Sequence, residues 1–271
     1  YEINQETKNF AAFLQSDWLI NSKLSLLSGI RTDQHNLIDN NIFSPRASLL
    51  YKLNNVQYRF NYSTGFRAPQ AFDTDLHIAF SGGGISRIEL SPNLEPEYSR
   101  SFSSSVNFDK GNQNFIYGFT LETFLTNLKN TFFLNQIGED NFGYIFEKQN
   151  GQRSNVSGIN IETRFNYKGK IQFQSGLTIQ SSRFKDKVTY INNTEGIKEF
   201  IRTPNNYGFA ILNIYPKRKI SLNINYIYTG RMKVPHFSGA INQDIDEIIT
   251  TQRFHELNSK ISYKITENKS Q

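Results

Sequence analysis

Hydrophobic and polar side chains alternate along this chain, and the segment from 56 to 66, VQYRFNYSTGF, shows the alternation most clearly. A period of two predicts a β-strand, because successive side chains leave opposite faces of a sheet. One face would hold Val56, Tyr58, Phe60, Tyr62, Thr64 and Phe66, and the other Gln57, Arg59, Asn61, Ser63 and Gly65. A dry core does not accept the second set unpaired. The pattern therefore predicts a strand with one apolar face and one wet face.

The same alternation predicts eleven strands in the chain. They are Phe10–Ile20, Lys23–Asp33, Pro45–Leu53, Val56–Phe66, Glu97–Phe108, Asn114–Leu128, Asn155–Tyr167, Ile171–Phe184, Asn206–Tyr215, Ile220–Thr229 and Thr251–Ile265. Their lengths of roughly 9–15 residues match the ~9–11 residues that a tilted strand needs to cross a bilayer. Strands of soluble sheets are shorter, commonly about 5–6 residues.

The connections between these strands alternate between short and long. One set has roughly two to six residues and the other about eleven to thirty, which is the asymmetry of periplasmic turns and extracellular loops in outer-membrane barrels. A soluble β-protein has no reason to place every long loop at one end. The predicted fold class is therefore all-β, an antiparallel transmembrane β-barrel.

Composition narrows the alternatives without deciding between them. The 271 residues have a mean hydropathy of −0.53 and 14% aromatic residues. No apolar run reaches the ~18 residues of a spanning helix. Aromatic loading suits the girdles of a barrel, but it also suits a soluble β-sandwich. The net charge of +6 is spread along the chain, so we expect no nucleic-acid partner, because such proteins gather basic residues on one face.

Candidate chemistry is sparse. Cysteine is absent, and the four histidines, His35, His77, His236 and His255, are scattered without the spacing of a metal site. The glycine run Ser81–Gly84 lacks the lysine of a phosphate-binding loop, and no nucleophile motif occurs. We therefore expect no metal site, no cofactor and no enzymatic activity. The start, Tyr1-Glu-Ile-Asn, has no basic or apolar stretch, so we expect a signal peptide that was removed or a piece of a longer chain.

Three short segments resemble the TonB-dependent outer-membrane receptors. Gly65-Phe-Arg-Ala-Pro69, followed by Gln70-Ala-Phe72, is similar to the family's GFRAP element. Ser91-Pro-Asn-Leu-Glu-Pro-Glu-Tyr-Ser99 looks like its NPNLKPE element, where the chain re-enters the barrel. Thr229-Gly-Arg-Met-Lys-Val-Pro-His236 is similar to an element that closes a late strand in siderophore and cobalamin-type receptors. The first two occur in the family's order and separation, and the resemblance covers essentially the whole chain.

The resemblance implies a 22-stranded barrel filled by an N-terminal plug. If Thr251–Ile265 is strand 20, Phe10–Ile20 is strand 10, and all short turns fall on the periplasmic side. Residues 1–271 would then be part of one barrel domain, without the plug, the TonB box, about nine earlier strands and the last two strands. The implied partners are the TonB complex through that plug, outer-membrane lipid, and a metal-chelate or cobalamin-like ligand. The implied location is the Gram-negative outer membrane.

Residue roles follow from the predicted topology. We expect a structural role for Arg67 and Pro69 at a strand end, because proline restrains the turn. The lumen-facing Arg59, Glu122, Glu162 and Arg164 are expected to form a charged inner wall against the plug. Ligand contacts are expected in the long loops, since loops on a rigid scaffold carry specificity. The ligand-binding candidates are Phe72, His77, Phe80, Arg87, Arg231, Lys233 and His236.

Three functions stay open from the sequence. The leading hypothesis is active uptake of a ferric siderophore, haem or a cobalamin-like ligand, driven through TonB. The second is a passive porin or structural barrel, for which we identify neither a constriction loop nor a charge ladder. The third is a soluble carbohydrate-binding β-protein, which would place Tyr58, Phe60 and Tyr226 in a sandwich core and would dissolve without detergent.

Overall fold

The computed structural model describes residues 6–70, 87–141, 143–191, 194–217, 219–236 and 244–265. Within these ranges the regular structure is entirely β-strand. None of the described residues belongs to a helix that is long and apolar enough to cross a membrane.

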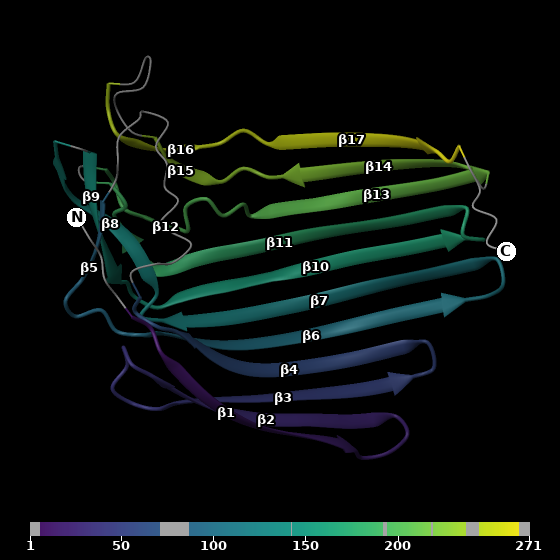
Figure 1. Ribbon diagram of the computed structural model, residues 1–271, viewed down its shortest axis with the longest axis horizontal. Coiled ribbons are helices and arrows are strands. Elements are labelled where there is room, and N and C mark those ends of the chain that lie inside the picture. The colour runs from purple at the N-terminus through teal and green to yellow at the C-terminus, as the bar shows by residue number, and fades with distance from the viewer. Residues whose placement is uncertain are drawn as a thin grey trace.

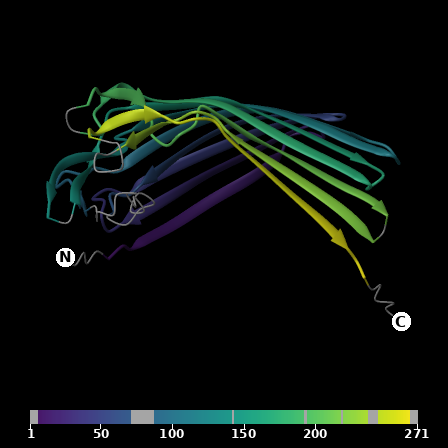
Figure 2. The same cartoon turned by 90° about the horizontal axis from the view of Figure 1, so that it is seen from above.

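Eleven long antiparallel strands lie side by side in one sheet, and each pairs with the next along this path (Figure 1). They are β1 (Asn9–Leu19), β2 (Leu24–His35), β3 (Ile42–Leu53), β4 (Val56–Arg67), β6 (Glu97–Gly111), β7 (Phe115–Lys129), β10 (Ser154–Tyr167), β11 (Ile171–Val188), β13 (Asn206–Lys217), β14 (Ile220–Thr229) and β17 (Phe254–Tyr263). These are the eleven strands that the sequence predicts, with bounds shifted by a few residues. The sheet is curved, with β1 and β17 at its edges (Figure 2).

The two ends of the sheet differ as the connection lengths predict. Short turns close one end, for example at Asn54, whose φ of 50° lies in the left-handed region that tight hairpins require. The other end carries six shorter strands (Figure 1). They are β5 (Arg87–Leu90), β8 (Phe132–Asp140), β9 (Gly143–Asn150), β12 (Ile197–Glu199), β15 (Lys233–His236) and β16 (Glu247–Thr250). The described parts of the long connections therefore include strands, whereas the sequence predicts only loops there.

One face of the long sheet is apolar across six neighbouring strands. The paired positions of β3, β4, β6, β7, β10 and β11 form a continuous row of Tyr51, Tyr58, Val106, Leu121, Ile161 and Leu177. Rings lie to either side of this row. Phe115 packs against Tyr167 near the short turns, and Tyr62 packs against Phe102 toward the other end, with centroid distances of 4.8 Å and 4.9 Å. An apolar band between two aromatic girdles is the outer surface of a membrane barrel.

The opposite face is polar, and its side chains bind one another across strands. Arg164 shows this best, because its guanidinium donates to Asp109 Oδ1 at 2.8 Å, to Asn107 Oδ1 at 2.7 Å and to Thr120 Oγ1 at 3.2 Å. The expected lumen-facing charges Arg164 and Glu122 thus lie on this face, and Glu122 accepts from Asn160 Nδ2 at 3.1 Å. Gly118 leaves the room that Arg164 fills, since a Cβ there would lie 2.6 Å from Arg164 Nε.

Among the described residues, the buried hydrophobic side chains lie at the end with the short strands. The buried hydrophobic cluster consists of Phe184, Val188, Tyr190 and Ile191, and the partly buried Phe133, Phe200 and Ile201 are among the residues that pack against it. We call the described residues within 87–96, 130–153, 184–205 and 230–253 the cap, and the eleven long strands, with β11 counted only as far as Arg183, the wall. The wall therefore holds no dry core of its own, whereas the cap is built like a small soluble domain.

Candidate functional site

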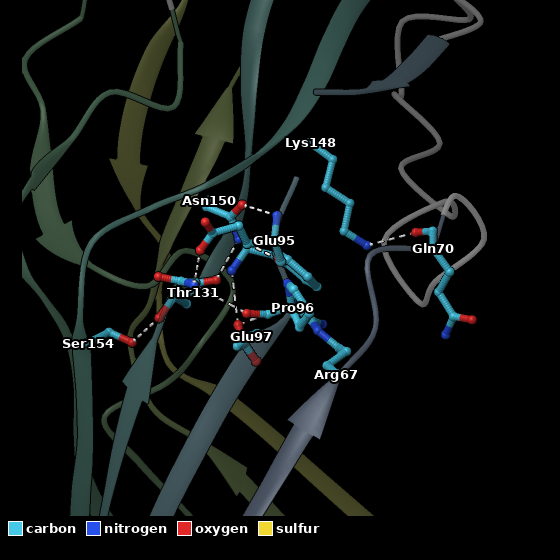
Figure 3. Close-up of polar contacts among 11 residues, drawn as sticks. Arg67, Gln70, Glu95, Pro96, Glu97, Thr131, Lys148, Asn150 and Ser154 are labelled. Atoms are coloured by element: carbon cyan, nitrogen blue, oxygen red, sulfur yellow. Dashed lines mark hydrogen bonds and ion pairs between the residues drawn. The ribbon is translucent and has the colours of Figure 1, made fainter. Parts of the chain in front are cut away.

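A network of hydrogen bonds joins the β8–β9 hairpin to the segment just before β6 (Figure 3). Asn150 Oδ1 accepts from the Glu95 backbone N–H at 2.6 Å, and Asn150 Nδ2 donates to the carbonyls of Glu95 and Asn130 at 2.8 Å and 3.0 Å. Asn130 Nδ2 donates to Glu95 Oε2 at 2.7 Å. Asn130 has a φ of 56°, a conformation that asparagine tolerates better than most residues. The segment that includes Glu95 therefore positions the hairpin over the end of the wall.

Arg67, at the end of β4, extends this network through a cation–π contact with the ring of Phe132. The Phe132 ring contacts two cations, with the Arg67 guanidinium carbon 4.6 Å and Lys148 Nζ 4.9 Å from its centroid. Glu97 Oε2 accepts from the Phe132 backbone N–H at 2.9 Å and lies 3.5 Å from Arg67 Nη2. Lys148, only 1% exposed, donates to the Gln70 carbonyl at 3.4 Å. These contacts account for Arg67 as a structural residue that joins the wall to the cap.

A pocket of about 310 Å³ opens beside the Phe132 ring, between this hydrogen-bond network and the buried hydrophobic cluster around Phe184. Six of its fourteen lining residues are aromatic, and Arg67, Glu97 and Arg202 supply charge. The lining residues are Arg67, Glu97, Leu128, Thr131, Phe132, Phe133, Leu134, Phe146, Phe184, Tyr190, Phe200, Ile201, Arg202 and Pro235. An apolar concavity with a few converging polar groups is the usual form of a small-molecule site.

Two features set the chemistry of this pocket. Burial raises the pKa of the Tyr190 phenol above its ordinary value, so Tyr190 stays neutral and donates to the Glu199 carbonyl at 3.3 Å. Arg202 has a φ of 55°, and its backbone N–H donates to the Lys233 carbonyl at 2.7 Å. A non-glycine residue in that conformation needs surrounding structure to hold it. The contact with β15 therefore fixes the Arg202 backbone at the edge of the pocket.

The seven ligand-binding candidates fall into two groups. Phe72, His77 and Phe80 lie outside the described residues, and Arg87 is the first residue of β5. Arg231, Lys233 and His236 lie together, and the last two belong to the strand that supplies Pro235 to the pocket. Arg231 is exposed, and His236 Nδ1 lies 3.6 Å from Glu247 Oε1. The structure therefore brings the late-loop candidates beside the pocket.

The aromatic lining of the pocket is what the sequence reading missed. Phe132, Phe133, Phe146, Tyr190 and Phe200 all come from segments between the predicted strands. The density of aromatic residues in 132–146 and 184–200 was the available signal, because exposed loops seldom carry so many large apolar side chains. No cluster of three histidine, cysteine, aspartate or glutamate side chains suited to a metal ion occurs among the residues that the structure describes.

A curved antiparallel sheet with an apolar outer band, aromatic girdles, a polar inner face and long connections at one end defines a wall of an outer-membrane β-barrel. The family model described as TonB dependent receptor-like, beta-barrel, matches residues 1–269. The chain belongs to this family, and it is an outer-membrane protein as the sequence predicts.

Solved structures share the fold at low sequence identity. The siderophore receptor PirA from Acinetobacter baumannii matches with a TM-score of 0.68 and 14% identity, over 96% of this chain and 40% of that one. The ferric-catecholate import receptor Fiu from K12 E. coli matches at 0.68 and 18%, over 97% and 39%. The copper transporter OprC matches at 0.69 and 11%, over 97% and 40%. A search of curated proteins by sequence finds no match.

The chain therefore spans about two fifths of the length of these three structures. The family is one of receptors and not of enzymes, which agrees with the expectation that the chain is not an enzyme.

Proposed function

We propose that this chain forms part of the barrel of an active outer-membrane receptor that binds a scarce nutrient at its extracellular mouth and imports it with energy from the TonB complex. The ligand is a metal chelate of the siderophore type. Haem and cobalamin-like compounds are the alternative ligands, and the growth experiment below compares all three. Energy coupling requires a plug of ~100–150 residues elsewhere in the protein, which is the size that a domain of this kind occupies.

The observation that carries this proposal is the pocket between the wall and the cap. Its lining combines aromatic rings with the charged residues Arg67, Glu97 and Arg202. That combination suits an anionic ligand with aromatic or other apolar groups, because arginine binds planar oxygen anions and stacks on rings. Arg231, Lys233 and His236 would add contacts from the late loop, and Phe72, His77, Phe80 and Arg87 from the earlier one.

The ligand class accords with the names of similar structures, which include siderophore receptors and a ferric-catecholate import receptor. Low identity means that those names support a class of ligand and not a particular compound. No covalent chemistry is part of the proposal, since the barrel supplies a rigid wall and a selective mouth.

The test is growth of a strain that lacks the gene, on defined ferric siderophores, haem or cobalamin as the limiting source. We expect loss of growth on one of these sources, restored by the full-length gene and lost again when TonB is deleted. Growth on every source without the gene, or growth that does not depend on TonB, would contradict active uptake and favour a passive barrel.

Two variants that each remove one positive charge test where the ligand binds. Arg202→Gln removes one cation from the pocket, and we expect about a tenfold or larger loss of affinity for an anionic chelate, since charge-assisted hydrogen bonds are worth about 1.5–3 kcal/mol. Lys170→Gln, in a turn at the opposite end of the wall, is the matched control and should leave affinity unchanged. Equal affinities in the two variants would exclude the pocket as the binding site.

A further inference from the structure

A second hollow, of about 960 Å³, lies at the cap end of the wall and is lined by four basic residues, Arg100, Lys129, Arg153 and Lys185. Its other lining residues are Asn41, Ile42, Phe43, Ser44, Pro45, Tyr62, Thr64, Gly65, Tyr98, Ser99, Asn127, Leu128 and Asn155. All four basic side chains are exposed. The pocket of the proposed function contains none of these four residues.

Strand register places this hollow on the outer, apolar face of the wall. Arg100 pairs with Thr64 and with Asn127. It lies two positions from Phe102 on β6, and residues two apart in a strand share a face. Lys129 is likewise four positions from Leu125, which pairs with Phe102. The cations therefore sit just beyond the apolar band, at the level where lipid headgroups begin.

The other two cations extend the same cluster across neighbouring strands. The Lys185 backbone N–H donates to the Arg153 carbonyl at 2.8 Å, which puts these two residues side by side. Like charges on adjacent strands repel one another and cost stability. Four of them around one hollow therefore call for an anion that the wall does not itself provide.

Nearby basic residues show that the chain supplies carboxylates elsewhere. Arg183 Nη2 lies 2.8 Å from Glu199 Oε1, and Lys187 is paired with Glu195. Arg31 is paired with Asp33 at 2.6 Å. In contrast, no described residue forms an ion pair with Arg100, Lys129, Arg153 or Lys185. The four cations around the hollow are therefore not neutralised by carboxylates of the described residues.

We propose that this hollow binds the phosphate groups of an anionic glycolipid in the outer leaflet of the outer membrane. Basic pockets at headgroup depth bind phosphorylated lipid head groups, because each cation near the surface attracts the anionic headgroup layer. The aromatic side chains fit the same partner. Phe43 is 63% exposed and Tyr62 packs on Phe102, so rings flank the cations where sugar and acyl chain meet. The lipid is a partner of the wall and is separate from the imported nutrient.

The test uses the full-length receptor, extracted in mild detergent and then placed in nanodiscs, with purified lipopolysaccharide as the probe. Arg100, Lys129, Arg153 and Lys185 are replaced together by glutamine. We expect lipopolysaccharide to bind this variant at least about a hundredfold more weakly than the unaltered receptor, since four surface cations each contribute to the attraction. The matched control is Arg183→Gln with Lys187→Gln, which removes basic residues that already have carboxylate partners and should change the affinity less than about threefold.

Three further measurements decide the outcome. Resistance of the barrel to unfolding in detergent at room temperature confirms that the variants are folded. Enzymatically dephosphorylated lipopolysaccharide should lose binding to the same degree as the fourfold variant, and millimolar inorganic phosphate should not displace the intact lipid. Equal binding of the dephosphorylated lipid, full displacement by inorganic phosphate, or cross-linking of Lys129 to an acidic protein in place of the lipid would each overturn the proposal.

Discussion

The wall and the cap are held together by different interactions. The wall has cross-strand hydrogen bonds, an apolar outer face and a polar inner face, and its large hydrophobic residues such as Phe60 and Phe102 are about half exposed, at 53% and 50%. In the cap, by contrast, the exposed fraction is 4% for Phe184 and 0% for Ile191. Lipid is therefore the apolar partner of the wall, while the cap has to supply its own. One chain therefore combines a region stabilised by contact with lipid and a region stabilised by its own buried hydrophobic core.

The largest expected effect separates the two regions by emptying the cap core. Phe184 packs on Phe200 with centroids 4.5 Å apart and on Tyr190 at 6.4 Å. Phe184→Ala should destabilise the cap by about 3–5 kcal/mol, the usual cost of removing a buried ring. We expect rapid protease cleavage within the cap of the assembled receptor, measured by mass spectrometry, while the barrel itself stays inserted. Simultaneous loss of insertion would show that wall and cap fold as one unit.

A second prediction tests which face of the wall meets lipid. Val106 belongs to the apolar row, and Ser105 lies on the other face, paired with Arg59 and Glu122. Val106→Arg should make folding into lipid vesicles less favourable by about 2–4 kcal/mol, the cost of an arginine near the bilayer midplane. Ser105→Arg places the same charge beside Glu122 and should cost much less in the same denaturant titration. The opposite order would mean that the two faces have been exchanged.

The smallest expected effect concerns the junction of wall and cap. Glu97→Ala removes the acceptor for the Phe132 N–H and the partner of Arg67, and should cost about 1–3 kcal/mol because it leaves a buried donor unsatisfied. Hydrogen exchange of the β8–β9 hairpin would report the loss. Glu97→Gln keeps an acceptor oxygen and should cost less. If both variants exchange as slowly as the unaltered protein, the junction does not hold the hairpin.

The wall could be predicted from sequence because each residue's face follows from its position in a period of two. All eleven strands were found this way, including Val56–Arg67, whose final residues open the GFRAP element. The bounds moved where tertiary pairing extends a ladder. β11 continues to Val188 because β12 pairs with it, and β3 begins at Ile42, before the predicted Pro45, because Ile42 pairs with Asp33.

The pocket could not be predicted in the same way. Arg67, Phe132, Phe184 and Phe200 are far apart in the sequence and meet only when three long connections fold together. Local alternation carries no information on such contacts. Motif similarity did single out Arg67 and the segment around Glu97, and the structure adds that their shared partner is the ring of Phe132.

The most direct test of the account is the side of the membrane on which each end of the wall lies. The chain has no cysteine, so single cysteines in a full-length receptor freed of any others can be labelled with a membrane-impermeant maleimide on intact cells. Gly138, in β8, has open space around its Cβ position, and Asn55 lies in a short turn at the other end. The account predicts that Gly138→Cys is labelled on intact cells and that Asn55→Cys is labelled only after the outer membrane is permeabilised. Labelling of Asn55→Cys on intact cells, with Gly138→Cys protected, would contradict the placement of the cap at the extracellular mouth.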